Sequence, residues 1–329
     1  MDVKMWIKAI QVMPRLTKEE WDRLDFVAKW LVAVRFAAVI LSIIAPAIAG
    51  LLAARDGMFS WWRWGLLTIG LVFAHGANNL INDWTDYRKG VDRDNYFRTQ
   101  YGPQPLESGI MTEKTLFNYI IITGLIAIAA GIPLVILRGL PALILMLVGA
   151  LFVLFYTWPL KYIGLGELTV LLVWGPLMIA GGYFVITGVW DWNVVIASLP
   201  FGLGSTSVIF GKHIDKLDAD KAKGIHTVPV LIGEKAARIV ALCMMALQFI
   251  SVIYLVVIGY FAWPMLIVLA TLFWFKPVWG IYTHPRPTEP PADAPENMWP
   301  LWFVAASFYQ NRIFGMLLIV GLIIQLFIH

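Results

Sequence analysis

The residues of this chain that could do chemistry gather first at the end of an apolar segment near residue 80. Asn79, Asn82, Asp83 and Asp86 follow one another there at intervals of three, one and three residues. On a helix, residues spaced by three, four and seven share one face, so the four side chains form one polar stripe. Polar side chains in such a segment are costly unless they face a cavity or a partner, so the stripe is a candidate functional site. Carboxylate and amide oxygens are the ligands that Mg²⁺ prefers.

A second group of acids, mixed with lysines, follows the apolar segment that ends near residue 213. Asp215 and Asp218 share one helical face, whereas Asp220 points elsewhere unless the helix unwinds between them. These acids could hold a second metal ion, and lysines among them, such as Lys216, would meet a diphosphate as point charges. A solvated loop of mixed charge is the alternative interpretation for this group. A solvated loop is a better explanation for one acidic group taken alone than for the two acidic groups taken together.

The elements that must position these residues are membrane-spanning helices. Hydrophobic residues make up 60% of the 329 residues, in blocks of about 20 with few or no charges, which is the length that crosses a bilayer. A soluble globular fold is excluded, and the blocks lack the polar face of helices that lie on a membrane surface. We expect an all-α polytopic membrane protein with about nine transmembrane helices. The blocks lie at 28–54, 64–82, 115–136, 139–158, 166–188, 193–213, 238–260, 262–281 and 300–327.

The chain divides into an N-terminal arm and a membrane domain. Residues 1–27 carry charges of both signs and no apolar block, so we expect a cytoplasmic or interfacial arm. Residues 28–329 then form the nine-helix domain. Residues 283–297 are polar and rich in proline, which predicts a loop between the last two helices.

Lysine and arginine are unevenly distributed among the loops. The arm and the loops after the second and sixth blocks are rich in them, whereas the loops after the fifth and seventh blocks have none. Short cytoplasmic loops carry the excess of these residues. We therefore expect the N terminus and the even-numbered loops in the cytoplasm and the C terminus outside. Both groups of acids then face one compartment.

The stretch from Asn82 to Asp92 reads N-D-x-x-D-x-x-x-G-x-D and follows Asn79. It resembles the first aspartate-rich motif of the UbiA superfamily of intramembrane prenyltransferases, and within it the 1,4-dihydroxy-2-naphthoate branch. The resemblance covers residues from about 30 to 327. The stretches that support the same branch are Arg35 with Pro46 and Gly50, the run from Tyr156 to Glu167, and Gly175-Pro176 through Gly181-Gly182-Tyr183.

The superfamily has nine helices and two aspartate-rich motifs that bind an isoprenyl diphosphate through Mg²⁺. The resemblance therefore implies an enzyme that transfers an isoprenyl group from a polyprenyl diphosphate to an aromatic acceptor such as 1,4-dihydroxy-2-naphthoate, as in menaquinone biosynthesis. Membrane lipid is a further expected partner, and nucleic acid is not. The implied catalytic acids are Asp83, Asp86, Asp215, Asp218 and Asp220, which with Asn82 are also the metal ligands, and the implied substrate-binding residues are Arg35, Asn79, Asn82, Lys161 and Lys216.

The chain departs from the family pattern at two places. Lys216 stands where the second motif usually has its first acid, with Asp215 one place early. Either a local bulge restores the geometry, or Asp215 and Asp218 share the role. The branch usually has G-P-L-R after the first motif, and residues 102–105 here read G-P-Q-P. Residues 227–233 also resemble the chlorophyll synthase branch, so an acceptor of that branch is the alternative.

Other interpretations remain open. The chain could be another UbiA-type prenyltransferase, with a chlorophyll synthase-like or other quinone or lipid acceptor, or a catalytically silent homologue that binds lipid or pigment. A transporter also places acids at broken helix ends, although the acids here lie at one face and not near the midplane. Arg35 either contacts the diphosphate or extends to the interface. His75 and His213 either act on the acceptor or are hydrogen-bonded structural groups, and Arg312 either faces a cavity or marks a helix break.

Overall fold

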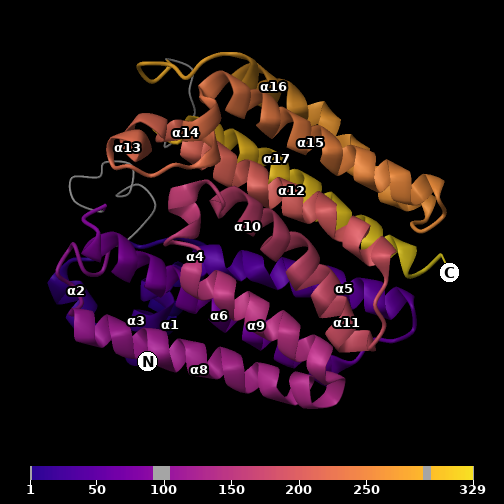
Figure 1. The fold of residues 1–329 in the computed structure, drawn as a ribbon, viewed down its shortest axis with the longest axis horizontal. Coiled ribbons are helices and arrows are strands. Elements are labelled where there is room, and N and C mark those ends of the chain that lie inside the picture. Colours follow the sequence, from indigo (N-terminus) through magenta and orange to yellow (C-terminus); the bar gives the residue numbers. More distant parts are fainter. Residues whose placement is uncertain (1, 92–103, 292–297, 329) are drawn as a thin grey trace. The chain divides into compact units, whose positions relative to one another are not determined.

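A computed structural model describes residues 2–91, 104–291 and 298–328 (Figure 1). Within these ranges the regular elements are helices and no β-strand occurs, which confirms the all-α expectation. Asp92, which closes the first motif in the sequence, and Gly102 and Pro103 lie outside the described residues.

The described ranges contain nine apolar helical segments, in agreement with the expected number. Eight of them are long and apolar enough to cross a membrane, and a ninth, Leu140–Phe155, is apolar but shorter. The protein is therefore a multi-pass integral membrane protein. The eight longer segments are Phe36–Arg55, Trp61–Arg88, Glu113–Arg138, Gly166–Thr187, Trp192–Asp215, Glu234–Val257, Trp263–Thr283 and Trp302–Gln325.

Two helix boundaries differ from expectation, and the position of Arg312 decides whether it marks a helix break. The first span begins at Phe36, not near residue 28, because Arg35 adopts a left-handed backbone conformation (φ 56°) that ends the preceding helix. The fourth segment ends at Phe155, three residues before the expected end, and Pro159 follows soon after. Arg312 is exposed on an uninterrupted helix, so it does not mark a break.

The chain forms two compact units. Unit 1 comprises Met1–Pro46 and Trp61–Trp158, and unit 2 comprises Ala47–Ser60 and Pro159–His329. Unit 1 contains α1 (Val3–Gln11), α2 (Lys18–Arg23), α3 (Phe26–Ala33), α4 (Phe36–Val39), η1 (Ile40–Ile43), the start of α5 (Ile44–Arg55), α6 (Trp61–Arg88), α8 (Glu113–Arg138) and α9 (Leu140–Phe155). Unit 2 contains the rest of α5, η2 (Leu160–Ile163), α10 (Gly166–Leu172), η3 (Val173–Ala180), α11 (Gly181–Thr187), α12 (Trp192–Asp215), α13 (Leu217–Ala222), α14 (Val228–Ile232), α15 (Glu234–Val257), η4 (Trp263–Trp274), α16 (Phe275–Thr283) and α17 (Trp302–Gln325).

The N-terminal helices of unit 1 begin at capping residues. Thr17 and Glu20 form a capping box at the start of α2. Asp25 accepts the N–H of Ala28 at the start of α3 and also the N–H of Asp2, so it fixes α1 beside α3. The division between arm and membrane domain at residue 27 stays a prediction.

Helix α6 is the element of unit 1 that carries the first motif, and it packs against α8 and α9. Gly76 permits a close approach: a Cβ there would lie 3.3 Å from Val34 and 3.4 Å from Thr123 of α8. The indole of Trp30 donates a hydrogen bond to Thr123 Oγ1 at 2.9 Å. These contacts hold the region around Arg35 beside α6.

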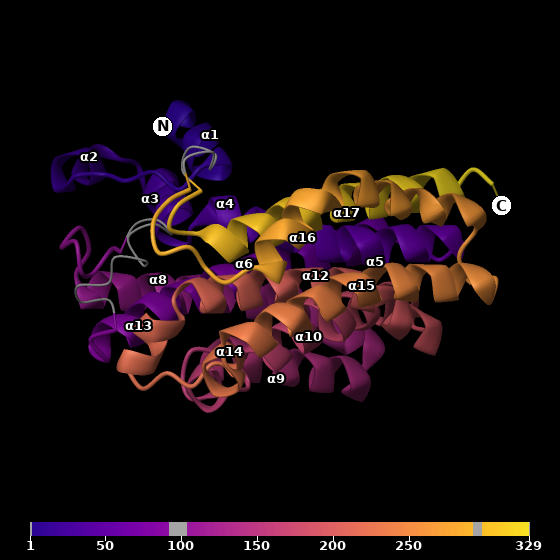
Figure 2. The same ribbon diagram turned by 90° about the horizontal axis from the view of Figure 1, so that it is seen from above.

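Helix α12 is the element of unit 2 that carries the second motif. It packs against α10, η3, α15 and α17, and Figures 1 and 2 both show α15 and α17 alongside it. Gly202 lies against Gly175, where a Cβ would be only 3.0 Å from the Gly175 Cα. Pro176 interrupts the regular helix, and η3 takes the wider π-helical form, in which Gly181 N bonds to Pro176 O.

Candidate active site

The first motif lies at the end of α6, and both of its described acids are buried. Asp83 is 2% exposed and Asp86 is 5% exposed. Their spacing of three residues puts them on one face of the helix. Helix α6 ends at Arg88, and Gly90 takes a positive φ of 67° in the turn where Val91 N bonds to Asp86 O. Two buried carboxylates at a helix end require positive charge or hydrogen-bond donors nearby.

Arg35 supplies positive charge to this motif. Its Nη2 lies 3.3 Å from Asp83 Oδ1 and donates a hydrogen bond to Asn79 O at 3.2 Å. The left-handed backbone of Arg35 is unusual for a residue other than glycine, and such conformations are concentrated at functional sites. The structure thus places Arg35 beside Asp83 and Asn79 of the first motif.

The asparagines of the stripe are oriented by their amide nitrogens. Asn79 Nδ2 donates to Val34 O at 2.8 Å, and Asn82 Nδ2 donates to Thr157 Oγ1 at 3.0 Å. Because the nitrogen of each amide faces its acceptor, the Oδ1 of each points away from it. The amide oxygen of Asn82 is therefore available for a ligand. Thr157 was not predicted as a site residue, and no spacing pattern links it to Asn82 in the sequence.

The second motif contains a helix interruption, which is one of the two alternatives that the sequence left open. Helix α12 ends at Asp215, Lys216 is non-helical (φ −115°, ψ 24°), and α13 begins at Leu217. Asp220 is buried, and its Oδ1 accepts a hydrogen bond from Lys216 Nζ at 2.7 Å. Among the residues that the structure describes, the buried Asp220 Oδ2 has no hydrogen-bond partner. Asp218 is exposed.

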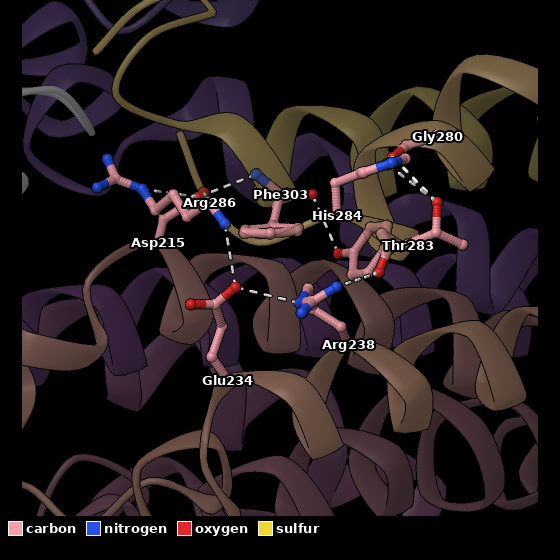
Figure 3. Close-up of polar contacts among 9 residues, drawn as sticks. Asp215, Glu234, Arg238, Gly280, Thr283, His284, Arg286 and Phe303 are labelled. Atoms are coloured by element: carbon pink, nitrogen blue, oxygen red, sulfur yellow. Dashed lines mark hydrogen bonds and ion pairs between the residues drawn. The ribbon is translucent and has the colours of Figure 1, made fainter. Parts of the chain in front are cut away.

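Asp215 has a different environment from the other acids of its motif. Its Oδ1 accepts the N–H of Phe303 at 2.9 Å (Figure 3). Its Oδ2 accepts the N–H of Val304 at 3.0 Å. Arg286 Nε lies 3.8 Å from Oδ1. Both oxygens are therefore engaged at the start of α17, and the assignment of Asp215 as a metal ligand stays a prediction.

Lys161, Glu167 and His213 are three further buried polar residues of unit 2. Lys161 is buried on η2, with its Nζ 5.7 Å from the ring centre of Tyr162. Glu167 Oε1 lies 2.7 Å from His213 Nδ1 and accepts the N–H of Val228 at 3.1 Å. His213 thus has a buried carboxylate partner. In unit 1, His75 Nδ1 lies 2.6 Å from Ser42 Oγ.

The predicted residues fall into two sets. Unit 1 holds Arg35, Asn79, Asn82, Asp83 and Asp86 together, and unit 2 holds the remaining predicted residues. Within the described ranges, no group of three or more Asp, Glu, His or Cys side chains is placed to hold a metal ion. Mg²⁺ commonly binds proteins through one or two carboxylates plus water and substrate phosphates. The pair Asp83 and Asp86 with the Asn82 oxygen fits that pattern.

Comparison with known proteins assigns the chain to a family. The model of the UbiA prenyltransferase family matches residues 43–301. The chain belongs to this family. It is 26% identical over 254 residues to the 2-carboxy-1,4-naphthoquinone phytyltransferase of Synechocystis, covering 74% of this chain and 79% of that one. It is 25% identical over 210 residues to the 1,4-dihydroxy-2-naphthoate octaprenyltransferase of Escherichia coli, covering 56% of this chain and 65% of that one.

The fold also matches solved structures. A UbiA homologue from Archaeoglobus fulgidus, bound to GPP and Mg²⁺, superposes with a TM-score of 0.57 at 16% identity, covering 88% of this chain and 99% of that one. The expected UbiA-type fold is thereby confirmed, and family membership confirms the expected enzyme class, a prenyltransferase.

Proposed function

We propose that this protein transfers an isoprenyl group from a polyprenyl diphosphate to an aromatic acceptor of the 1,4-dihydroxy-2-naphthoate type. The observation that carries the proposal is the buried pair Asp83 and Asp86, with Arg35 held 3.3 Å from Asp83, in a chain of the UbiA prenyltransferase family. Two relatives named for naphthoquinone or naphthoate prenylation support the acceptor class. An isoprenyl diphosphate and Mg²⁺ bound to a homologue of the same fold support the donor and the metal.

The donor atoms of the first motif fit Mg²⁺. Asp83, Asp86 and the Asn82 amide offer hard oxygen ligands within one turn of helix, and they leave positions for diphosphate oxygens. For a second Mg²⁺ we propose Asp220, whose buried Oδ2 has no hydrogen-bond partner within the described part of the chain, together with the exposed Asp218. Asp215 was predicted with them, and its contacts are considered separately below. When bound, Mg²⁺ would neutralise the negative charge of the diphosphate as it leaves.

The chain's own residues have two further proposed roles. Arg35, Lys161 and Lys216 bind the diphosphate by charge, because a leaving group of developing negative charge is stabilised by fixed cations. Asn79 holds the chain around Val34 beside α6 and so keeps Arg35 close to Asp83. The reaction breaks the allylic C–O bond, forms a bond from that carbon to the aromatic ring, and releases a ring proton and diphosphate.

The proposed orientation follows the distribution of basic residues. The N terminus and the loops that carry both motifs face the cytoplasm, and the C terminus lies outside. The 1–27 arm then lies in the cytoplasm or at the membrane interface. Membrane lipid surrounds the apolar surfaces of the helices.

The test is a transfer assay with the purified full-length protein, Mg²⁺, labelled polyprenyl diphosphates and a panel of aromatic acceptors. We expect prenylated product with a dihydroxynaphthoate and loss of at least about 100-fold in rate on Asp83→Asn or Asp86→Asn, because each substitution removes a metal-binding charge. Asp22→Asn, at an exposed Lys18–Asp22 ion pair, is the control and should keep the rate. Equal turnover in the Asp83 and Asp86 variants at saturating Mg²⁺ would contradict the assigned site, and a folded wild-type protein without activity on any acceptor would indicate a silent homologue.

A further inference from the structure

The carboxylate of Asp215 lies at the first turn of α17. Phe303 and Val304, whose N–H groups it accepts, are the second and third residues of that helix. The first N–H groups of a helix have no partner within the helix and need an acceptor from outside. Leu301 precedes the helix and makes no side-chain cap. Asp215, at the end of α12, therefore caps α17 from a neighbouring helix.

Arg286 connects Asp215 with the segment between α16 and α17. Its backbone N–H donates to Glu234 Oε1 at 3.0 Å, and its Nη2 donates to Pro300 O at 3.1 Å. Its guanidinium carbon lies 4.6 Å from the ring centre of Trp299. The Arg286 Nε also lies 3.8 Å from Asp215 Oδ1. The Arg286 side chain thus connects the start of the segment between α16 and α17 with the end of that segment, at Pro300, and with the end of α12.

The contacts continue into a closed ring of polar interactions (Figure 3). Glu234 Oε1 lies 3.1 Å from Arg238 Nε, and Arg238 Nη1 donates to Tyr282 O at 3.0 Å. The Tyr282 hydroxyl donates to Phe303 O at 3.1 Å, which returns the ring to the residue that Asp215 caps. The ring joins α12, α15, α16 and α17 at one end of unit 2.

This environment is unsuited to a cation. Both Asp215 oxygens accept N–H bonds of ordinary length, and the side chain is fully buried. Mg²⁺ keeps an octahedral shell that includes several waters, which needs space beside the ligand. The positive end of the α17 dipole and the Arg286 guanidinium both face this carboxylate, and both repel a metal ion.

We propose that Asp215 is a positioning residue and not a metal ligand. It holds the start of α17 and Arg286 against the end of α12, and so fixes the non-helical turn at Lys216 that leads into Asp218 and Asp220. The significance of that turn for catalysis rests on the proposed function. The acid at 215 thus does not replace the acid that the family pattern has at 216.

The test compares Asp215→Asn and Arg286→Gln with Asp220→Asn in the full-length protein. We expect the first two to lower the unfolding temperature in EDTA and to lower kcat, while the half-saturating Mg²⁺ concentration stays within about twofold of the wild type. Asp220→Asn should raise that concentration by at least about tenfold, as loss of a metal contact does. The loss in the double variant should be smaller than the sum of the two single losses, because Asp215→Asn and Arg286→Gln both remove the Asp215–Arg286 ion pair.

A second readout is independent of turnover: Mn²⁺ binding measured by electron paramagnetic resonance in the presence of an unreactive prenyl thiodiphosphate. We expect the Asp215 variant to bind the same number of Mn²⁺ ions as the wild type. The proposal is overturned if Asp215→Asn loses a bound Mn²⁺ while its unfolding temperature in EDTA is unchanged. If Asp215→Asn fails to fold in EDTA, the proposal is supported, because a residue that only binds metal is not needed for folding when no metal is present. Arg286→Gln must then lower kcat without changing the Mg²⁺ dependence. A wild type without transfer activity would refute the proposed function, and the binding and unfolding results would still decide the role of Asp215.

Discussion

The close approach of α12 and α17 at Gly211 predicts a large effect of a single methyl group. In Gly211→Ala the new Cβ would lie 2.7 Å from the carbonyl carbon and oxygen of Phe303 and 2.8 Å from the Tyr282 hydroxyl. Ordinary contact needs about 3.5 Å, so the Phe303 backbone must retreat by about 0.8 Å. A backbone cannot turn aside as a flexible side chain does. The same movement would stretch the Phe303 N to Asp215 Oδ1 bond, now 2.9 Å, beyond hydrogen-bonding distance.

The expected loss of stability follows from these two effects. Overpacking costs about 1–3 kcal/mol, and loss of a hydrogen bond to a charged group costs about 1.5–3 kcal/mol. Alanine in place of helical glycine returns about 0.5–1 kcal/mol, which leaves a net loss of about 2–5 kcal/mol.

The assay is equilibrium unfolding of the full-length protein in mixed micelles, followed by tryptophan fluorescence. Gly280→Ala on α16 is the matched control, because its Cβ would meet no atom within 4 Å. We expect the control to be as stable as the wild type or slightly more stable. A Gly211→Ala variant as stable as the control would refute the described packing of α12 against α17.

Three further predictions concern other parts of the chain. Arg35→Ala should destabilise the protein in EDTA by about 1.5–3 kcal/mol, because it removes the positive charge that lies 3.3 Å from the buried Asp83 carboxylate. Arg35→Ala combined with Asp83→Asn should recover part of the loss, and no change in the single variant would contradict the ion pair. Hydrogen bonds from the backbone N–H groups of Ala28 and Asp2 lower the pKa of Asp25 from 3.8 to about 2, so Asp25 stabilises α1 and α3 fully above pH 4 and loses this effect as the pH falls through 2. Limited proteolysis by pepsin should therefore find the arm protected at pH 4 and cleaved near pH 2, and Asp25→Asn should remove that difference. Lys221→Cys in a Cys243→Ser background should react with an impermeant maleimide only from the cytoplasmic side, and labelling only from outside would reverse the proposed topology.

Hydropathy and helical spacing predicted the number of apolar helices and placed the first motif on a helix end. The interruption near Lys216 was only one of two alternatives in the sequence: Asp215 and Asp220 cannot share the face of an ideal helix, but a continuous helix with Asp215 and Asp218 on one face was equally compatible with the spacing. Asp215's partners were not predictable, since Phe303 and Val304 lie 88 and 89 residues further along the chain. The same limit applies to the pairs Arg35–Asp83 and His213–Glu167, which depend on how distant helices meet. The late start of the first span depends on a left-handed residue that is not glycine, and residue type alone does not signal that conformation.

The most direct test of the central claim is a single-turnover experiment with a doubly labelled polyprenyl diphosphate, carrying one label in the prenyl chain and another in the diphosphate. The purified protein is mixed with this donor, a dihydroxynaphthoate and Mg²⁺, and both labels are followed together. We predict that released diphosphate and prenylated acceptor appear in equal amounts, and that neither appears in EDTA or in the Asp83→Asn variant. Diphosphate release without a prenylated acceptor, or an intact donor with every aromatic acceptor offered, would contradict the account.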